Sequence, residues 1–164
     1  MSLRDEILEN NPEIELAEEK FDSALVGVVE QFGGEIEPLY DWEILKTLPI
    51  RYDVLTEFDL HVLFRMKIDE ISEKQGDTLI ADGYDDEVLG VVSKKGEDTV
   101  VIYDREAVIE KKENEIMSEE DYEDDPDYPA ITHAIEDYSY NFIGGYLGSK
   151  TWKCATLYKE YEQK

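Results

Sequence analysis

Two parts of the chain carry the same order of apolar and polar positions, 63 residues apart. Phe21–Val29 aligns with Tyr84–Val92 without a gap. Between residues 16 and 43, nine of 28 positions are identical to their partners, whereas ordinary residue frequencies would give about two. This pattern predicts a duplication in one compact unit, with residues 1–65 as a first repeat whose C-terminal part diverges and residues 66–164 as a second. Two similar hairpins that converged independently are the alternative.

Each repeat shows the pattern of a short acidic helix, two strands and a second helix. Glycine in the turns between the strands favours hairpins, because glycine readily adopts positive φ. An aspartate at the start of the second helix can cap it, and an acidic residue in the first turn suits the positive end of the helix dipole. The predicted elements are helices over 3–10 and 68–74, strands over 24–30, 36–40, 87–93 and 99–103, turns at 33–34 and 95–98, and helix starts at Asp41 and Asp104 with Glu43 and Glu106 in the first turn.

Beyond these elements the two copies diverge. Alternation over Asp59–Ile68 predicts a strand, although four of its apolar residues also share one face of a helix. Apolar spacing predicts a helix over 129–144, which Gly144-Gly145 would end, and a last strand over Thr151–Tyr158. The predicted fold class is α+β, a mainly antiparallel sheet with helices on one face, built from two related repeats.

The second copy contains a series of short motifs. The series begins with aromatic-Asp-Asp and ends with Asn-x-x-Gly-x-x-x-Gly. They are Tyr84-Asp85-Asp86, Leu89-Gly90-Val91, Tyr103-Asp104, Ala134-Ile135-Glu136-Asp137 and Asn141-Phe142-Ile143-Gly144 with Gly148. About residues 66 to 158 thereby resemble a family of small, uncharacterised, phage-encoded proteins. The first copy matches only as far as Tyr40-Asp41, and the acidic run 113–128 includes an insertion relative to the pattern. The resemblance implies a viral origin and transfers no activity.

Charge narrows the possible partners. The chain has 42 Asp and Glu against 16 Lys and Arg, a net charge of −26. A chain of this sign repels phosphate, so direct binding to DNA, RNA or an anionic membrane is not expected. The single cysteine, Cys154, cannot form an internal disulfide, and neither a signal peptide nor an apolar run of membrane-spanning length is evident. We therefore expect a protein of the cytoplasm, here that of a bacterial host.

The densest acidic segment spans 113–127, and no Lys or Arg occurs between Lys112 and Lys150. One reading is a solvated loop that only keeps the protein soluble. The other is a surface that mimics the phosphate backbone of DNA and binds a protein partner, with tyrosines adding contact area. The residues predicted to bind the partner are Glu113, Glu115, Glu119, Glu120, Asp121, Tyr122, Glu123, Asp124, Asp125, Asp127 and Tyr128. Tyr40 and Tyr103, at repeat-related positions, are expected to pack in the core instead.

No motif indicates catalysis. His61 and His133 have no nucleophile motif around them and are expected to be packing or surface residues. Asp121, Glu123 and Asp125 have the spacing that opens an EF-hand loop, but Pro126 stands where that loop needs glycine. We therefore expect no catalytic residue, no metal site and no cofactor.

Together these features predict a phage-type inhibitor of a host nucleic-acid enzyme, either a CRISPR effector or a restriction system. The expected partner is an enzyme with a basic groove that the acidic surface occupies. The alternative is a non-catalytic accessory or structural phage protein whose acidic surface serves solubility. The sequence leaves the oligomeric state open.

Overall fold

The computed structural model describes residues 2–30, 36–49, 60–74, 80–81, 83–143 and 152–158. The helices are α1 Leu3–Asn10, α2 Trp42–Leu45, α4 Ile68–Lys74, α5 Arg105–Met117 and α6 Ala130–Asp137. The strands are β1 Leu25–Glu30, β2 Glu37–Asp41, β3 His61–Arg65, β4 Val88–Ser93, β5 Val100–Asp104 and β6 Lys153–Leu157. Short helical turns at Glu19–Ala24 and Asp85–Glu87 precede β1 and β4, and a π-helical turn at Tyr138–Phe142 follows α6.

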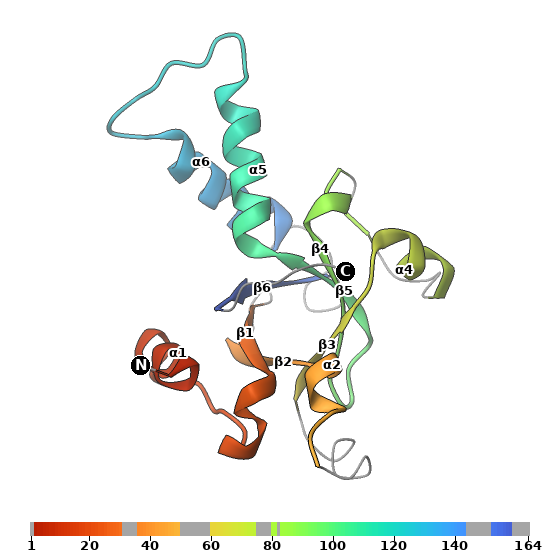
Figure 1. Cartoon of the computed structure of the whole chain (residues 1–164). Helices are drawn as coiled ribbons and strands as arrows, with labels where there is room; N and C mark the ends of the chain where they lie inside the picture. Colours follow the sequence, from red (N-terminus) through yellow and green to blue (C-terminus); the bar gives the residue numbers. More distant parts are fainter. Residues whose placement is uncertain are drawn as a thin grey trace.

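The six strands form a closed barrel in chain order, in which β6 pairs with β1. Four of the pairings are antiparallel, and two, β2 with β3 and β5 with β6, are parallel. The α+β class and the mainly antiparallel pairing are as predicted, but the sheet is closed into a barrel rather than open. Closure leaves no unpaired edge strand, because β6 pairs with β1. The helices lie around the outside of the barrel, on different sides (Figure 1).

Three clusters of buried apolar side chains account for the stability of this arrangement. One contains residues from all six strands and therefore fills the barrel. A second lies under α1 and α2, and a third lies under α4, α5 and α6. Each strand thus buries side chains on both faces, inward into the barrel and outward under a helix.

The two halves of the barrel have corresponding parts. The bounds of β1 and β4, and those of β2 and β5, differ by the 63 residues of the sequence repeat. Gly27 and Gly90 lie at irregularities in the first hairpin of each half, and a Cβ at either would collide with the backbone oxygen of a neighbouring strand. Tyr40 and Tyr103 are both fully buried, as predicted, and their hydroxyls accept hydrogen bonds from backbone amides at 3.0 and 2.8 Å.

Several local predictions can be compared with the structure. Residues 61–65 form a strand, so the helical reading of this segment is wrong. The predicted helix over 129–144 appears as α6 and the π-helical turn after it. The predicted turn at Gly33-Gly34 and the helix end at Gly144-Gly145 lie outside the described residues. No helix within the described ranges combines the length and the apolar character needed to cross a membrane.

Candidate functional site

The predicted partner-binding residues lie on a helical hairpin that extends away from the barrel (Figure 1). We call α5, residues 118–129 and α6 the acidic hairpin. Its first helix begins at Asp104, whose carboxylate accepts hydrogen bonds from the amides of Glu106 and Ala107 at 3.1 and 3.4 Å. The aspartate cap predicted from the sequence is therefore present, and it starts the helix at the end of β5.

One ion pair ties the two helices of the hairpin together near its base. Lys112 on α5 lies 2.6 Å from the carboxylate of Asp137 on α6, and the lysine is buried. Its ammonium also lies over the rings of Tyr84 and Phe142, at 5.2 and 5.7 Å from their centroids. Burial is the largest influence and would lower the pKa of Lys112, but the interactions with Asp137 and Tyr84 together outweigh it and the pKa is raised. The lysine therefore stays charged and holds the base of the hairpin.

The acidic side chains of the hairpin are turned to solvent. Glu113 is half-buried and the other eight carboxylates from Glu115 to Asp127 are exposed. Within the described ranges none of the nine forms an ion pair. The hairpin thus carries a series of exposed carboxylates that no described cation pairs with.

The two tyrosines of the predicted set are half-buried and hold local contacts. The hydroxyl of Tyr122 donates to Asp124 at 3.2 Å, and that of Tyr128 donates to Glu136 on α6. The ring of Tyr128 packs on His133, with 3.8 Å between centroids. The contacts of Tyr128 fasten the end of residues 118–129 to α6, whereas that of Tyr122 lies within this connection.

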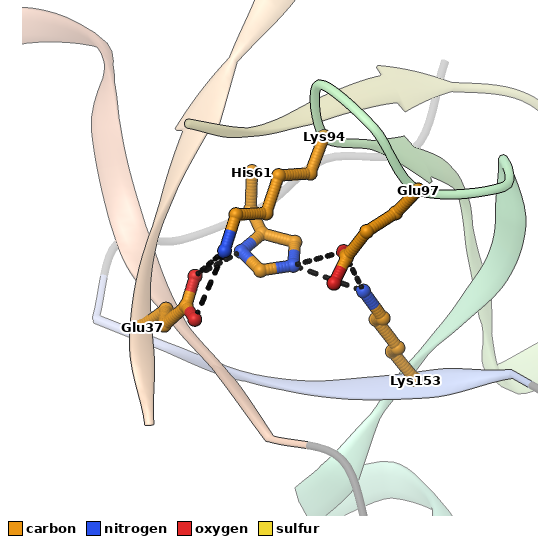
Figure 2. A network of polar contacts seen from close by, with 5 residues as sticks. All are labelled: Glu37, His61, Lys94, Glu97 and Lys153. Carbon is orange, nitrogen blue, oxygen red and sulfur yellow. Dashed lines mark hydrogen bonds and ion pairs between the residues drawn. The ribbon is translucent and has the colours of Figure 1, made fainter. Parts of the chain in front are cut away.

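A second polar cluster, which sequence reasoning missed, lies at one end of the barrel (Figure 2). We call Glu37, His61, Lys94, Glu97 and Lys153 the barrel-mouth network. His61 opens β3 and Lys153 opens β6; in register they pair with Leu39 and Ile102, which are themselves 63 residues apart. The two side chains therefore come from corresponding places in the two halves, and Nζ of Lys153 lies 3.0 Å from Nε2 of His61.

Opposite charges alternate through the barrel-mouth network. On one side of the imidazole, Lys94 bonds both carboxylate oxygens of Glu37 at 2.7 and 3.1 Å. On the other side, Lys153 bonds Glu97 at 2.8 Å, and that carboxylate lies 3.6 Å from His61 Nε2 (Figure 2). Gly96, at φ 84°, allows the turn that brings Glu97 over the barrel end.

His61 is neutral in this setting. Its side chain is 2% exposed and Lys153 is 3% exposed. Burial and the nearby Lys153 charge lower the pKa of His61 to about 4. Because an ammonium can only donate, Nε2 of His61 must accept, which assigns the ring proton to Nδ1. Burial would raise the pKa of Glu97, but the hydrogen bond and charge of Lys153 outweigh it and lower that pKa.

A cavity of about 810 Å³ adjoins the barrel-mouth network. The described residues that line it are Asn11, Pro12, Glu13, Ile14, Glu15, Ile36, Glu37, Pro38, Leu60, His61 and Lys94. The Nδ1 atom of His61 lies 3.0 Å from Glu37 Oε2, at an angle that makes no hydrogen bond, and it has no hydrogen-bond partner among the described residues. This buried nitrogen therefore lies beside the Glu37 carboxylate without a hydrogen bond to it.

His61 is buried, in agreement with a packing role, and it also takes part in a polar network that the sequence did not predict. The alternation in β3 did contain a signal, because His61 shares a strand face with Leu63, and both are buried while Val62 and Phe64 are only half-buried. The inward face of β3 is therefore the one that carries the histidine. The sequence could not connect the histidine to its partners in the network, since a long stretch of chain separates His61 from each of them.

The groups of the barrel-mouth network are ionic and imidazole groups. The barrel-mouth network contains carboxylates, ammoniums and an imidazole but no hydroxyl or thiol. Nearby Cys154 is fully buried, and burial raises the pKa of its thiol, which leaves it an unreactive core residue. Among the described residues no group of three or more His, Cys, Asp or Glu side chains is arranged to hold a metal ion.

Comparison of the chain with protein-family models, with curated proteins and with solved structures gives no match.

Proposed function

We propose that the protein is a phage-type inhibitor that binds a nucleic-acid enzyme of a bacterial host, a CRISPR effector or a restriction enzyme, through the acidic hairpin. The observation that carries this proposal is the exposure of the carboxylates from Glu115 to Asp127 on an extended hairpin, without a described cation to compensate them. Such a surface can enter a groove lined with Lys and Arg.

The physical basis is competition for the same cations. Duplex DNA carries one charge per about 1.7 Å of its axis, and a basic groove is matched to that density. A negatively charged protein surface is attracted to the same groove from a distance, and this attraction speeds association in low salt. The helix cap at Asp104 and the buried Lys112–Asp137 pair would lower the cost of binding, because they order the two helices of the hairpin beforehand.

We also propose that the two halves of the barrel arose by duplication. The 63-residue offset between corresponding strands, the paired glycines Gly27 and Gly90, and the corresponding positions of His61 and Lys153 support it. The acidic hairpin then lies in the connection between β5 and β6 of the second copy, where the first copy connects β2 to β3.

The decisive experiment is affinity capture from a bacterial lysate followed by a competition assay on the captured enzyme. Inhibition by mimicry predicts that the enzyme no longer binds DNA when the protein is present. If no nucleic-acid enzyme is captured, or if the captured enzyme binds DNA normally in the complex, the proposal is wrong.

Two sets of substitutions, each removing four negative charges, separate a specific surface from net charge. The hairpin set is Glu119→Gln, Glu120→Gln, Asp121→Asn and Glu123→Gln, all at exposed positions. The control set is Glu6→Gln, Glu9→Gln, Glu18→Gln and Glu19→Gln, also exposed. We expect the hairpin set to raise Kd for the enzyme at least about tenfold near 50 mM salt, with a smaller effect near 300 mM, and the control set to raise it less than about threefold. Equal increases would show that net charge rather than the hairpin surface drives binding, and no increase with either set would show that charge serves only solubility.

A further inference from the structure

The acidic hairpin also carries most of the exposed large apolar side chains. In the part of the chain that the structure describes, five such side chains are exposed, and four of them lie on the hairpin or on the π-helical turn after it. These four are Met117 on α5, Ile131 and Ile135 on α6, and Tyr140 in the turn. Single exposed apolar side chains are ordinary on protein surfaces, but a concentration of them on one element needs a physical reason.

Helix α6 turns its small apolar side chains inward and its large ones outward. Ala130 and Ala134 are buried, whereas Ile131 and Ile135 are 39% and 40% exposed. Burial of an isoleucine contributes more free energy than burial of an alanine, so packing within this chain does not account for the arrangement. The two isoleucines are four residues apart and therefore form a row along one side of the helix. Such a row fits the apolar stripe of a second helix.

The charges around the isoleucine row favour a basic partner. No Lys or Arg occurs between Lys112 and Lys150, and Lys112 is buried and already forms an ion pair. Glu136 is exposed beside Ile135, and the carboxylates of residues 119–127, which precede the helix, are exposed too. A second copy of the chain would present the same acidic face and would be repelled. A helix with lysines or arginines beside its apolar stripe matches both the charge and the row.

We propose that Ile131 and Ile135 dock a basic amphipathic helix of the partner protein. Its apolar stripe would pack on the two isoleucines, and its Lys and Arg side chains would meet the carboxylates of the hairpin. The inference rests on the proposed role of the acidic hairpin as the binding surface, and it names the element that this surface receives. Ion pairs weaken as salt rises, whereas apolar contacts do not, so part of the affinity should resist salt.

A defined peptide tests the docked helix directly. The probe is a fluorescently labelled helical peptide of about 15 residues, with leucines along one face and lysines at both edges of that face. A control peptide has the same composition in an order that spreads the leucines around the helix. We expect the probe to bind with a Kd of about 10–100 µM near 150 mM salt, and the control peptide to bind at least about fivefold more weakly. In native protein labelled at the isoleucine methyl groups, the probe should shift the signals of Ile131 and Ile135 but not that of Ile36.

Matched substitutions distinguish the isoleucine row from exposed apolar surface in general. Ile131→Ser and Ile135→Ser, each made alone, shorten the row, and serine has about the same helix propensity as isoleucine. Ile36→Ser is the control, because Ile36 is 44% exposed and lies outside the hairpin. We expect each variant of the row to raise the Kd of the probe at least about fivefold near both 150 and 300 mM salt, and Ile36→Ser to raise it less than about twofold. The four charge substitutions of the hairpin set should raise it more at the lower salt.

Four results would overturn the inference. They are equal binding of the two peptides, no methyl shift at Ile131 or Ile135, equal effects of Ile135→Ser and Ile36→Ser, and self-association of the chain that Ile135→Ser abolishes in sedimentation equilibrium. The last result would assign the row to a second copy.

Failure of this inference can be told apart from failure of the proposed function. A captured nucleic-acid enzyme that loses DNA to the protein, and that binds Ile135→Ser as tightly as the native chain, would refute the docked helix and leave the function standing. Binding of the probe at the isoleucine row without capture of any nucleic-acid enzyme would support the docked helix and refute the proposed identity of the partner.

Discussion

Protonation of His61 provides the sharpest test of the barrel-mouth network. The imidazole lies inside a closed barrel, between two ammonium groups and two carboxylates. Burial and the Lys153 charge lower its pKa from 6.5 to about 4. In the unfolded chain the ring takes up a proton near pH 6.5, but in the folded protein it does so only near pH 4. Acidification between these values therefore favours unfolding.

The magnitude follows from the two pKa values. The contribution of His61 to the free energy of unfolding is fully present above pH 6.5 and is lost progressively as the pH falls toward 4. Linkage gives a loss of about 2 kcal/mol at pH 5 and about 3 kcal/mol at pH 4. The stability of the whole chain also depends on pH through its many other charges, so the effect must be measured as a difference between two proteins.

The matched variant is His61→Gln, whose side-chain oxygen can still accept a hydrogen bond from Lys153. Urea denaturation of both proteins at several pH values between 7 and 4 gives the difference in their free energies of unfolding. We expect the native protein to lose about 2 kcal/mol more than His61→Gln between pH 7 and pH 5. A ¹⁵N-histidine titration provides an independent measurement of the pKa.

Two results would refute the reasoning. If the difference between the two proteins is constant from pH 7 to pH 4, the folded and unfolded pKa values of His61 are equal, and the ring is not held as described. If the native protein gains stability relative to His61→Gln on acidification, the carboxylates rather than Lys153 dominate the potential at the imidazole.

Three further substitutions test the fold. Gly90→Ala should lower the free energy of unfolding in urea by about 2 kcal/mol or more, because φ is 153° and the new Cβ would meet the backbone oxygen of Phe64; an unchanged value would show that β3 can move away. Arg65→Met should cost about 3 kcal/mol in the same assay, since it leaves the fully buried Asp41 without its ion-pair partner, and recovery in a double variant with Asp41→Asn would identify the pair as the cause. Asp104→Ala should cost about 1 kcal/mol by removing the cap of α5; no loss of helical circular dichroism or stability would contradict that role.

The helix start at Asp104 and the exposure of the acidic residues were predictable from local sequence, whereas the continuation of α5 to Met117 and its packing on α6 were not. A carboxylate placed before an amphipathic segment caps a helix wherever the fold puts it, and a run of carboxylates without Lys or Arg must face solvent because burial of uncompensated charge is too costly. Glu115 to Asp127 are accordingly exposed. The ion pair that joins the two helices was not predictable, since Lys112 contacts Asp137 only when α5 packs on α6.

The sequence by itself determined the local elements, their order along the chain and the offset between the two halves. Alternation, glycine turns and aspartate caps act over only a few residues. Only the tertiary structure decided that the sheet closes, with β6 paired to β1 and with parallel neighbours at β2–β3 and β5–β6. Closure turned the histidine face of β3 inward and brought Glu37, Glu97 and Lys153 to it. Strand pairing and burial depend on contacts between distant segments, whose free energy no local pattern records.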